Sequence, residues 1–200
     1  MRQATANAAP RANLSRVDPP APPSPFLVER LDDVADASRL GPVVDVACGS
    51  GRHALALATR GIAAVGVDRD ESRLRDLAQR ARRESLPLRL VRADLEAAPS
   101  PPWGASRAGA LLVFRYLHRP LCAALADGLR PGGLLLYETF TIAQRELGYG
   151  PVNPAFLLEP GELPALFRTL DILSFEEGLT RDGRPAALAR LVARRPRARA

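Results

Sequence analysis

The sequence predicts an α/β fold in which a doubly wound, mostly parallel sheet carries helices on both faces and ends in an antiparallel hairpin. From residue 42 onward, short apolar runs alternate with segments of helical spacing, as in strand–helix–strand units. The first run breaks into a loop of small residues, VVDVACGSGRH at 43–53, which leads directly into a helical pattern. After Phe140 the rhythm changes, and two short runs flank the turn signal Asp182-Gly183.

Each element follows from a local signal. Runs rich in Val, Leu and Ala predict five buried strands, at 42–47, 63–68, 88–94, 109–114 and 134–140. Helical spacing predicts the helices between them, at 53–60, 71–84 and 120–129, the last of which is ended by the sequence RPGG. Downstream, a short helix at 162–170 precedes the two strands of the hairpin, at 171–178 and 185–195. Such an order implies right-handed crossovers and a hairpin added at the sheet edge.

The chain of 200 residues suits a single domain, which we expect to span residues 26–194. Residues 1–25 hold six of the 19 prolines and have little to bury, so they predict a disordered or draped Pro-rich arm. This arm is either a dispensable tail or a flap over the active site, because the next segment, 26–36, has helical apolar spacing. Residues 195–200 form a basic tail.

The charge pattern argues against nucleic acid as a partner. The net charge of +6 comes from the ends of the chain, with +2 in residues 1–25 and +4 in residues 194–200, so the rest sums to zero. All 28 basic residues are arginine, which together with abundant Ala and Pro is typical of a GC-rich bacterial genome. A chain without lysine cannot build a phosphate-binding P-loop or a pyridoxal Schiff base, which excludes both classes.

Cysteine usage and hydropathy predict a cytoplasmic protein. Cys48 and Cys122 are expected to be small buried thiols in a reducing compartment rather than a disulfide. The sequence shows no metal-ligand spacing, so a zinc site is not indicated. No apolar run approaches the roughly 20 residues that cross a bilayer, and the N-terminus lacks the apolar stretch of a secretory signal.

The glycine loop lies where ligands bind in a parallel sheet, beyond the carboxyl end of the first strand. A dinucleotide fingerprint, GxGxxG, requires glycine at positions 47, 49 and 52, whereas the chain has Ala47, Gly49 and Arg52. Two of the three glycines are missing, which argues against an NAD enzyme. Acidic residues end the second and third strands, at Asp68 and Asp94. Together with Asp45 they would form one acceptor-rich pocket.

The segments VVDVACGSGRHALALATRG, VGVDRD, RLVRADLE and LRPGGLLLYETF resemble, in order and spacing, the motifs of class I S-adenosylmethionine-dependent methyltransferases. The similarity covers about residues 40–140. Within that superfamily, with its Rossmann-like fold, the chain resembles the small tellurite-resistance-type methyltransferases. The segments VFRYLHRPL, YETFT and NPAFLLEPGEL look closer still to a bacterial branch of that group.

The resemblance implies S-adenosyl-L-methionine as cofactor and a set of residues around it. Asp45 would lie near its ammonium, Asp68 would accept from the ribose hydroxyls, and Asp94 with Leu95 would hold the adenine. Gly49 and Gly51 would leave room for the methionine and ribose moieties. The full set is Asp45, Ala47, Cys48, Gly49, Gly51, Asp68, Arg69, Asp94, Leu95 and Phe114.

Each of these residues also has a structural interpretation. Asp45 could be a buried acid that is paired locally, and Asp68 or Asp94 could cap the next helix. Many family members have glycine at the position of Ala47, so the backbone there must tolerate a β-carbon or shift slightly. Cys48 is expected to be a small filler, and a nucleophilic or redox role would require a lowered pKa.

The segment FRYLHRPL, at the end of the fourth strand, supplies the candidate catalytic residues Arg115, Tyr116 and His118. Tyr116 would shape the site, and His118 would accept a proton, hold an anion, or merely cap a helix. Arg115 or Arg119 would help to bind a negative acceptor.

Two further segments are expected at the site. Tyr137, Glu138 and Thr139 offer a polar wall on the fifth strand, and the loop with Asn153, Phe156 and Glu162 is either a lid or an ordinary connection.

The resulting hypothesis is in-line methyl transfer to a small molecule, either an anion or a soft sulfur, selenium or tellurium nucleophile that needs no base. The expected partner is that methyl acceptor, with neither a membrane nor nucleic acid. Two alternatives stay open: an RNA or protein methyltransferase, and a non-catalytic regulator or partner subunit that binds the cofactor.

Overall fold

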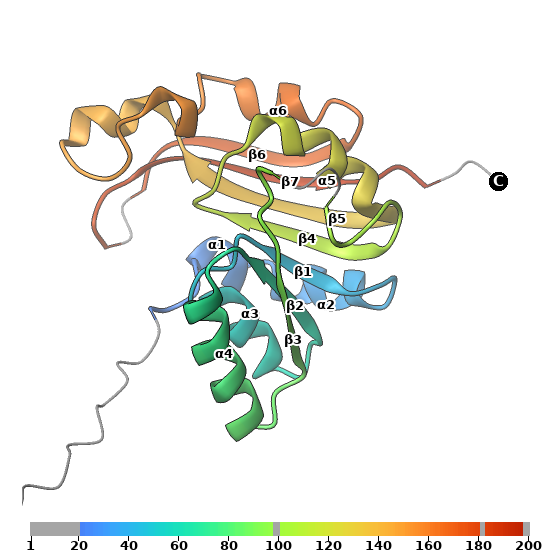
Figure 1. Cartoon of the computed structure of the whole chain (residues 1–200). Helices are drawn as coiled ribbons and strands as arrows, with labels where there is room; N and C mark the ends of the chain where they lie inside the picture. The colour runs from blue at the N-terminus through green and yellow to red at the C-terminus, as the bar shows by residue number, and fades with distance from the viewer. Residues whose placement is uncertain (1–20, 98–100, 181–182, 198–200) are drawn as a thin grey trace, which may run out of the picture.

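The computed structural model describes residues 21–97, 101–180 and 183–197, which fold around one seven-stranded sheet with the order β3-β2-β1-β4-β5-β7-β6 (Figure 1). The strands β1 to β5 are parallel, whereas β7 runs antiparallel to both β5 and β6. The predicted fold class, including the C-terminal hairpin, is confirmed. The strands are β1 (Val43–Val46), β2 (Ala64–Asp68), β3 (Leu88–Arg92), β4 (Ala108–Phe114), β5 (Leu129–Phe140), β6 (Asp171–Leu179) and β7 (Ala187–Arg194).

Helices cover both faces of the sheet, in two groups. One face packs against α1 (Pro25–Val28), α2 (Leu31–Ser38), α3 (Arg52–Ala58) and α4 (Glu71–Arg83). The other face packs against α5 (Cys122–Gly128) and α6 (Glu162–Leu166), which complete the largest apolar cluster. The described residues also form three 3-10 helices, η1 (Arg119–Leu121), η2 (Ile142–Leu147) and η3 (Pro154–Phe156).

Local sequence signals explain where the helices begin and which side they bury. The Asp70 side chain accepts from the backbone N–H of Arg73 and caps α4, whose Leu74, Leu77 and Ala81 form the buried face. Ser24 caps α1 in the same way, with proline at the first helical position. Both helices are therefore specified by residues that lie within one turn of their start.

Three element boundaries differ clearly from the prediction, and the simplest case is the helix predicted at 162–170, which as α6 ends at Leu166. The helical segment at 26–36 divides into α1 and α2, with Arg30 in a non-helical conformation between them. The sequence RPGG at 130–133 does not precede the fifth strand but belongs to β5, where the register with β4 shifts. Pro131 has no N–H for the ladder and Gly132 has a φ of +82°, so these residues form a bulge inside the strand.

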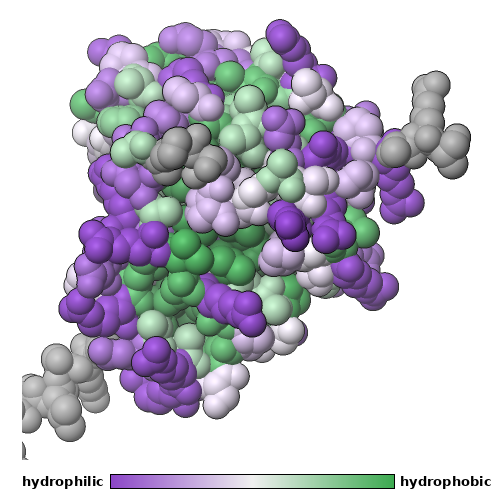
Figure 2. Space-filling model, turned by 45° about the vertical axis from the view of Figure 1, so that its right-hand side comes forward, coloured by the Kyte–Doolittle hydropathy of each residue, from purple (hydrophilic) through white to green (hydrophobic). Residues whose placement is uncertain are grey.

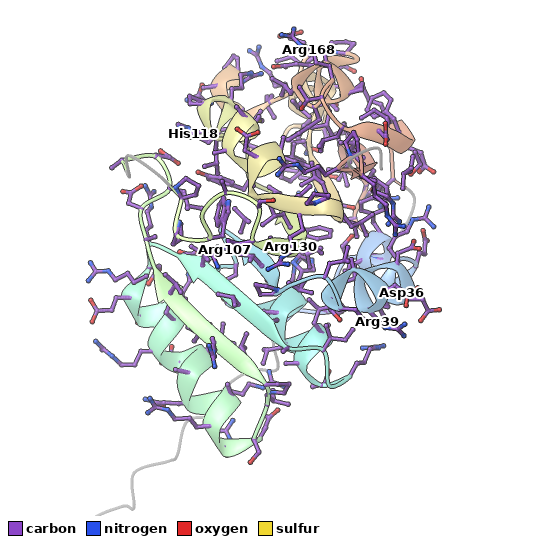
Figure 3. The ribbon with its side chains drawn as sticks, turned by 90° about the vertical axis from the view of Figure 1, so that its right-hand side faces the viewer. Asp36, Arg39, Arg107, His118, Arg130 and Arg168 are labelled. Atoms are coloured by element: carbon purple, nitrogen blue, oxygen red, sulfur yellow. The ribbon has the colours of Figure 1, made fainter. Side chains whose placement is uncertain are left out.

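The connection between β3 and β4 leaves part of the sheet without a helix. Its described residues, 93–97 and 101–107, form turns, and Trp103 packs against Gly128. Figure 3 accordingly shows β2 and β3 with no helix in front of them. Val65 and Val91 remain partly exposed there, and Figure 2 shows apolar side chains in a hollow on this side of the molecule. This face is therefore less fully covered than the prediction of a doubly wound sheet suggests.

The ends of the described chain stay in contact with the sheet. Ser24 is 4% exposed, and Arg195 donates its backbone N–H to the carbonyl of Gly133. Most of the predicted arm and half of the basic tail, residues 1–20 and 198–200, lie outside the described residues, as does Asp182 of the hairpin turn. Within the described residues, every helix falls short of the length and apolar character that a bilayer crossing needs.

Candidate active site

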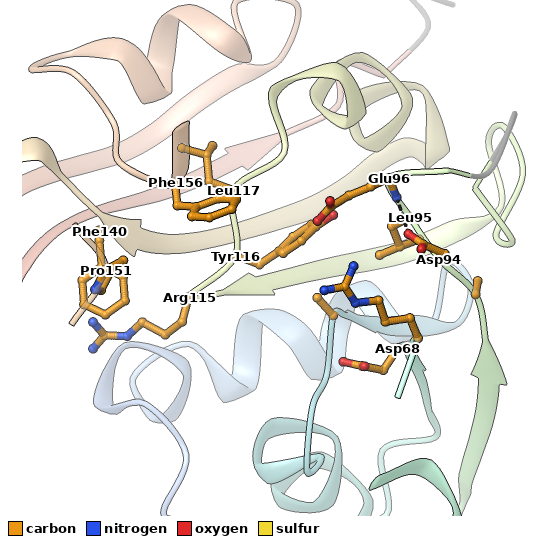
Figure 4. Close-up of a pocket in the computed structure, with 13 residues that line it drawn as sticks. Asp68, Asp94, Leu95, Glu96, Arg115, Tyr116, Leu117, Phe140, Pro151 and Phe156 are labelled. Atoms are coloured by element: carbon orange, nitrogen blue, oxygen red, sulfur yellow. Dashed lines mark hydrogen bonds between the residues drawn. The ribbon is translucent and has the colours of Figure 1, made fainter. Parts of the chain in front are cut away.

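A pocket of about 430 Å³ opens at the carboxyl ends of the parallel strands, near the point where the strand order reverses between β1 and β4 (Figure 4). Side chains from the loops after β1, β2, β3 and β4 line it, together with the last residues of β2 and β5 and two residues that follow β5. These lining residues are Ala47, Asp68, Arg69, Ala93, Asp94, Leu95, Glu96, Arg115, Tyr116, Leu117, Phe140, Pro151 and Phe156.

The glycine loop takes its shape from left-handed backbone conformations. Ala47 and Gly49 have φ values of 55°, and Gly51, which caps α3, has a φ of 75°. A β-carbon on Gly51 would lie 2.3 Å from Leu77 Cδ2, so only glycine fits there. Ala47 keeps its β-carbon in the same left-handed region and lines the pocket. The loop therefore tolerates alanine where the related enzymes were expected to have glycine.

Asp68 both fixes the glycine loop and faces the pocket. Its Oδ2 accepts from the Gly49 N–H at 2.7 Å, and its Oδ1 accepts from the Asp70 N–H at 2.9 Å. Each carboxylate oxygen has a second lone pair, so Asp68 can still accept two hydrogen bonds from a ligand.

The loop after β3 supplies two more acids to the pocket wall. Asp94 Oδ1 accepts from the Glu96 N–H at 3.0 Å. Leu95, which lies between these two acids in the sequence, is buried. Glu96 lines the pocket but was not predicted, although it lies in the same strand-end loop as Asp94. Together with Asp68, three carboxylates face one cavity.

Several predicted residues lie behind the pocket rather than in it. Asp45 is 1% exposed, and its Oδ2 accepts from the Ala54 N–H at 3.0 Å, while burial raises its pKa to about 7. The Cys48 thiol packs against Leu55, Leu74 and Leu77, and burial raises its pKa. Asp45 therefore has the locally paired environment that was its alternative interpretation, and Cys48 has the environment of a small buried filler.

Phe114 and the glycines also serve the scaffold. The ring of Phe114 stacks on His53 with centroids 3.9 Å apart and meets Phe26 edge-on at 6.4 Å. Gly49 and Gly51 shape the loop but are not among the lining residues. Of the predicted cofactor set, the pocket therefore brings together Ala47, Asp68, Arg69, Asp94 and Leu95.

The end of β4 brings Arg115 and Tyr116 to the pocket. Arg115 has a φ of 58°, donates its N–H to the Glu138 carbonyl at 2.7 Å, and stacks its guanidinium 4.5 Å from the Phe140 ring centre. The hydroxyl of Tyr116 is buried and has no hydrogen-bond partner among the described residues, and burial raises its pKa to about 12. Figure 4 shows Tyr116 pointing toward the loop of Asp94 and Glu96. Tyr116 therefore offers a hydrogen-bond donor inside the pocket.

His118 and Arg119 do not face this pocket. The His118 carbonyl accepts from Leu121, at the start of η1. Arg119 forms a two-pronged ion pair with Glu162, at 2.5 and 2.8 Å, and donates to the carbonyls of Ala155 and Leu157. Of the two arginines expected to help bind a negative acceptor, Arg115 lines the pocket, whereas the donors of Arg119 hold the loop at 155–162.

The expected polar wall on β5 is buried. Tyr137, Glu138 and Thr139 are each at most 1% exposed, and the Tyr137 hydroxyl donates to the Tyr116 carbonyl at 3.0 Å. In the expected lid, Asn153 accepts from Ala155 and caps η3, while Phe156 is half exposed and lines the pocket.

The part of the sequence that forms most of this pocket resembles a known protein family. Residues 43–133, which include the glycine loop and both acidic strand ends, match the family model described as a methyltransferase domain. Over these residues the chain carries a methyltransferase domain. No curated protein sequence matches the chain.

Solved structures confirm the fold of this methyltransferase domain. TehB from Haemophilus influenzae superposes with a TM-score of 0.65 at 20% identity, over 82% of this chain and 62% of that one. A methyltransferase from Methanosarcina mazei gives 0.65 at 17% identity, over 88% of this chain and 100% of that one. Geranyl diphosphate C-methyltransferase from Streptomyces coelicolor gives 0.60 at 15% identity, over 84% and 80%. The chain thus spans less than two thirds of the TehB chain.

The methyltransferase family implies S-adenosylmethionine as methyl donor, and the pocket fits it chemically. This cofactor presents hydroxyls, an ammonium and an adenine amino group, all of which donate hydrogen bonds. The pocket presents the carboxylates of Asp68, Asp94 and Glu96, which accept them. The unpartnered Tyr116 hydroxyl adds a buried donor, which costs about 1 to 3 kcal/mol if it stays unsatisfied and therefore favours a polar ligand.

A network that sequence analysis missed joins the N-terminal segment of the methyltransferase domain to β5. The Ser24 N–H donates to His53 Nε2 at 3.2 Å, and the Ser24 hydroxyl donates to Glu138 Oε2 at 2.9 Å. Arg190 donates to the same oxygen at 2.9 Å, and Arg115 Nε lies 3.4 Å from Glu138 Oε1. The network consists of Ser24, His53, Glu138 and Arg190. Its members come from four separate segments, so no local pattern predicts it.

Proposed function

We propose that the enzyme transfers a methyl group from S-adenosylmethionine to a small molecule, either an anion or a soft sulfur, selenium or tellurium nucleophile. The observation that carries this proposal is the pocket at the strand ends, which three acids line together with Arg115, Tyr116, Phe140 and Phe156. A cavity of about 430 Å³ suits small molecules, whereas nucleic acid requires an extended basic surface.

The roles we assign follow the donors and acceptors of the pocket. Asp68 would accept from the two ribose hydroxyls, and Asp94 would accept from the adenine amino group, with Leu95 against the ring. Ala47 and the backbone of the glycine loop would lie along the methionine moiety, and Arg69 would close the side near Asp68. Tyr116 would donate a hydrogen bond from its hydroxyl to a polar atom of the bound pair, and Arg115 would face the acceptor.

The chain contributes alignment rather than a strong base. The chain has two histidines, and neither lines the pocket: His53 accepts from Ser24 and burial lowers its pKa to about 3, while His118 lies near η1. Tyr116, with a pKa of about 12, stays protonated. An acceptor that arrives with a free lone pair suits these surroundings. S-adenosylmethionine would supply an electrophilic methyl group, which would pass to the acceptor lone pair as its bond to sulfur breaks and leaves a neutral thioether.

Calorimetric titration with S-adenosylmethionine, S-adenosylhomocysteine and NAD tests the cofactor assignment. We expect the first two to bind and NAD not to bind. Asp68→Ala should weaken binding of S-adenosylhomocysteine by tenfold or more, because two charge-assisted hydrogen bonds are lost. Asp68→Asn, which can still accept from Gly49, separates ligand contacts from loop damage, and Asp76→Ala on the exposed side of α4 is the control. Tight binding of NAD would overturn the proposal.

A methylation screen then identifies the acceptor. Thiols, selenite, tellurite and small carboxylic acids are incubated with labelled cofactor, and the formation of S-adenosylhomocysteine is measured. We expect turnover with a member of this panel and none with RNA fragments or protein. Turnover on RNA or protein alone would contradict a small-molecule acceptor.

A further inference from the structure

A second cavity, of about 370 Å³, lies on the other side of Arg115 from the cofactor pocket and is lined by arginines. We call it the arginine pocket, and its charged or hydroxyl-bearing residues are Ser24, Arg52, Arg115, Thr180, Arg184 and Arg190. These residues come from the N-terminal segment, the start of α3, the end of β4, and the two sides of the hairpin turn. Arg115 lines both cavities, so the two are adjacent.

The arginine pocket carries more positive charge than its acids balance. The buried carboxylate of Glu138 pairs with Arg115 and Arg190. Within the described residues, Arg52 and Arg184 form no ion pair: Arg52 donates to the Pro22 carbonyl at 3.4 Å, and Arg184 stacks 3.4 Å from the Tyr149 ring centre. In the part of the chain that the structure describes, four guanidinium groups therefore face one carboxylate. Burial lowers the pKa of Arg115, and the charges of Arg52 and Arg190 lower it further.

The surroundings hold the guanidinium groups in place and neutralise only part of their charge. Glu138 is 0% exposed and fixes Arg190, whose side chain is 18% exposed, through a hydrogen bond of 2.9 Å. Arg115 is held by the same carboxylate and by stacking on Phe140, and Arg184 by stacking on Tyr149. Guanidinium groups that are fixed in advance lose little side-chain entropy when they bind the planar oxygens of a carboxylate or the oxygens of a phosphate.

We propose that the arginine pocket binds the anionic group of the methyl acceptor, a carboxylate or an oxyanion of the phosphate type. This inference rests on the proposed function, since it assigns a substrate class to the same enzyme. An anion held by Arg52, Arg184 and Arg190 leaves the rest of the acceptor to pass Arg115 into the cofactor pocket. The acceptor is then a small acid whose nucleophilic atom is separated from its charged group.

Pyrophosphate is the probe for this pocket, titrated by calorimetry into the enzyme saturated with S-adenosylhomocysteine. We expect binding to the wild type and a loss of affinity of about tenfold or more in Arg52→Gln and in Arg184→Gln. Arg168→Gln, an exposed arginine outside both cavities, is the matched control and should bind as the wild type does. Absence of pyrophosphate binding, or equal binding by all three variants, would overturn the proposal.

The carboxylate of the cofactor itself is the competing source of an anion. Binding of S-adenosylhomocysteine is therefore compared with binding of 5′-methylthioadenosine, which lacks the amino-acid part. We expect the affinities of S-adenosylhomocysteine and of 5′-methylthioadenosine for Arg52→Gln and Arg184→Gln to stay within about twofold of those for the wild type. If the variants weaken only S-adenosylhomocysteine, the pocket holds the cofactor and the inference is wrong. If S-adenosylhomocysteine fails to bind the wild type, the proposed function fails, and pyrophosphate titration of the free protein still reports on the arginine pocket.

Discussion

The cofactor pocket and the buried region behind it each hold carboxylates close to the ends of parallel strands, yet their oxygens point to different partners. Asp68 and Asp94 accept backbone N–H bonds and still line the cavity. Asp45 and Glu138 are 1% and 0% exposed, and their oxygens meet a helix N–H, a serine and arginines inside the protein. Position along a strand therefore does not decide whether an acid binds ligand; what decides it is whether open space is left beside the carboxylate.

The strongest expected effect is on the pH dependence of stability, where Asp45 and His53 act in opposite directions. Burial raises the pKa of Asp45 from 3.8 to about 7, so between these values the folded state holds a proton that the unfolded state has released, and stability falls as pH rises. Burial lowers the pKa of His53 from 6.5 to about 3, so there the unfolded state holds the extra proton and stability rises with pH. Each contribution is about 4 to 5 kcal/mol at full extent, and the two largely cancel.

Single substitutions of Asp45 and His53 should separate the two opposing contributions to the pH dependence of stability. As pH rises from 4 to 7, the free energy of unfolding of Asp45→Asn should increase relative to that of the wild type. As pH rises from 3 to 6.5, the free energy of unfolding of His53→Gln should decrease relative to that of the wild type. Asparagine still accepts from Ala54, and glutamine still offers an acceptor to Ser24, so packing is preserved. Urea unfolding at a series of pH values measures both. Curves for the two variants that run parallel to the wild type would show that neither group titrates abnormally.

Removal of the Glu138 carboxylate should be the next largest effect. Glu138→Ala leaves Arg115 and Arg190 without their buried counter-charge and Ser24 without its acceptor, at a cost of about 3 to 5 kcal/mol. The comparison is Asp94→Ala, whose carboxylate is exposed and whose loss should cost under about 1 kcal/mol. Both are measured by urea unfolding at neutral pH. An equal loss for the two acids would remove the distinction between the buried region and the pocket.

For binding of S-adenosylhomocysteine, the order of the two acids should be reversed. Asp94→Ala is expected to lower the free energy of binding by more than it lowers the free energy of unfolding, whereas Glu138→Ala lowers mainly the free energy of unfolding.

The sequence predicts what depends on near neighbours. Alternating apolar runs predict the parallel strands, and the end of each run predicts where Asp68 and Asp94 lie. Contacts between distant segments carry no such local signal: Ser24 meets Glu138 across 114 positions, and Arg190 meets it across 52. Glu96 could have been predicted from its place two residues after Asp94. Arg52 follows the glycine loop directly, but its role depends on the hairpin, which only the fold brings near.

The pair of Arg119 and Glu162 illustrates the same limit and gives the smallest predicted effect. In sequence, Arg119 lies beside the catalytic candidates and was expected to bind an anion, but its carboxylate partner follows 43 positions later. The side chains are 34% and 21% exposed, so solvent screens this ion pair more than a buried pair but less than a surface pair. A double-mutant cycle with Arg119→Ala and Glu162→Ala should give a coupling energy of about 1 to 2 kcal/mol.

The exposed pair of Arg75 and Glu71, with side chains 65% and 56% exposed, provides the matched cycle on α4 and should give about 0.3 to 0.5 kcal/mol. Because Arg119 also holds the carbonyls of Ala155 and Leu157, its loss should free Phe156 at the edge of the cofactor pocket. Arg119→Ala should then raise KM for the acceptor more than it lowers kcat, since the damage is to the wall of the site and not to the reacting groups. If its coupling energy does not exceed that of the α4 pair, Arg119 contributes no more than a surface charge, and the loop at 155–162 is held by packing alone.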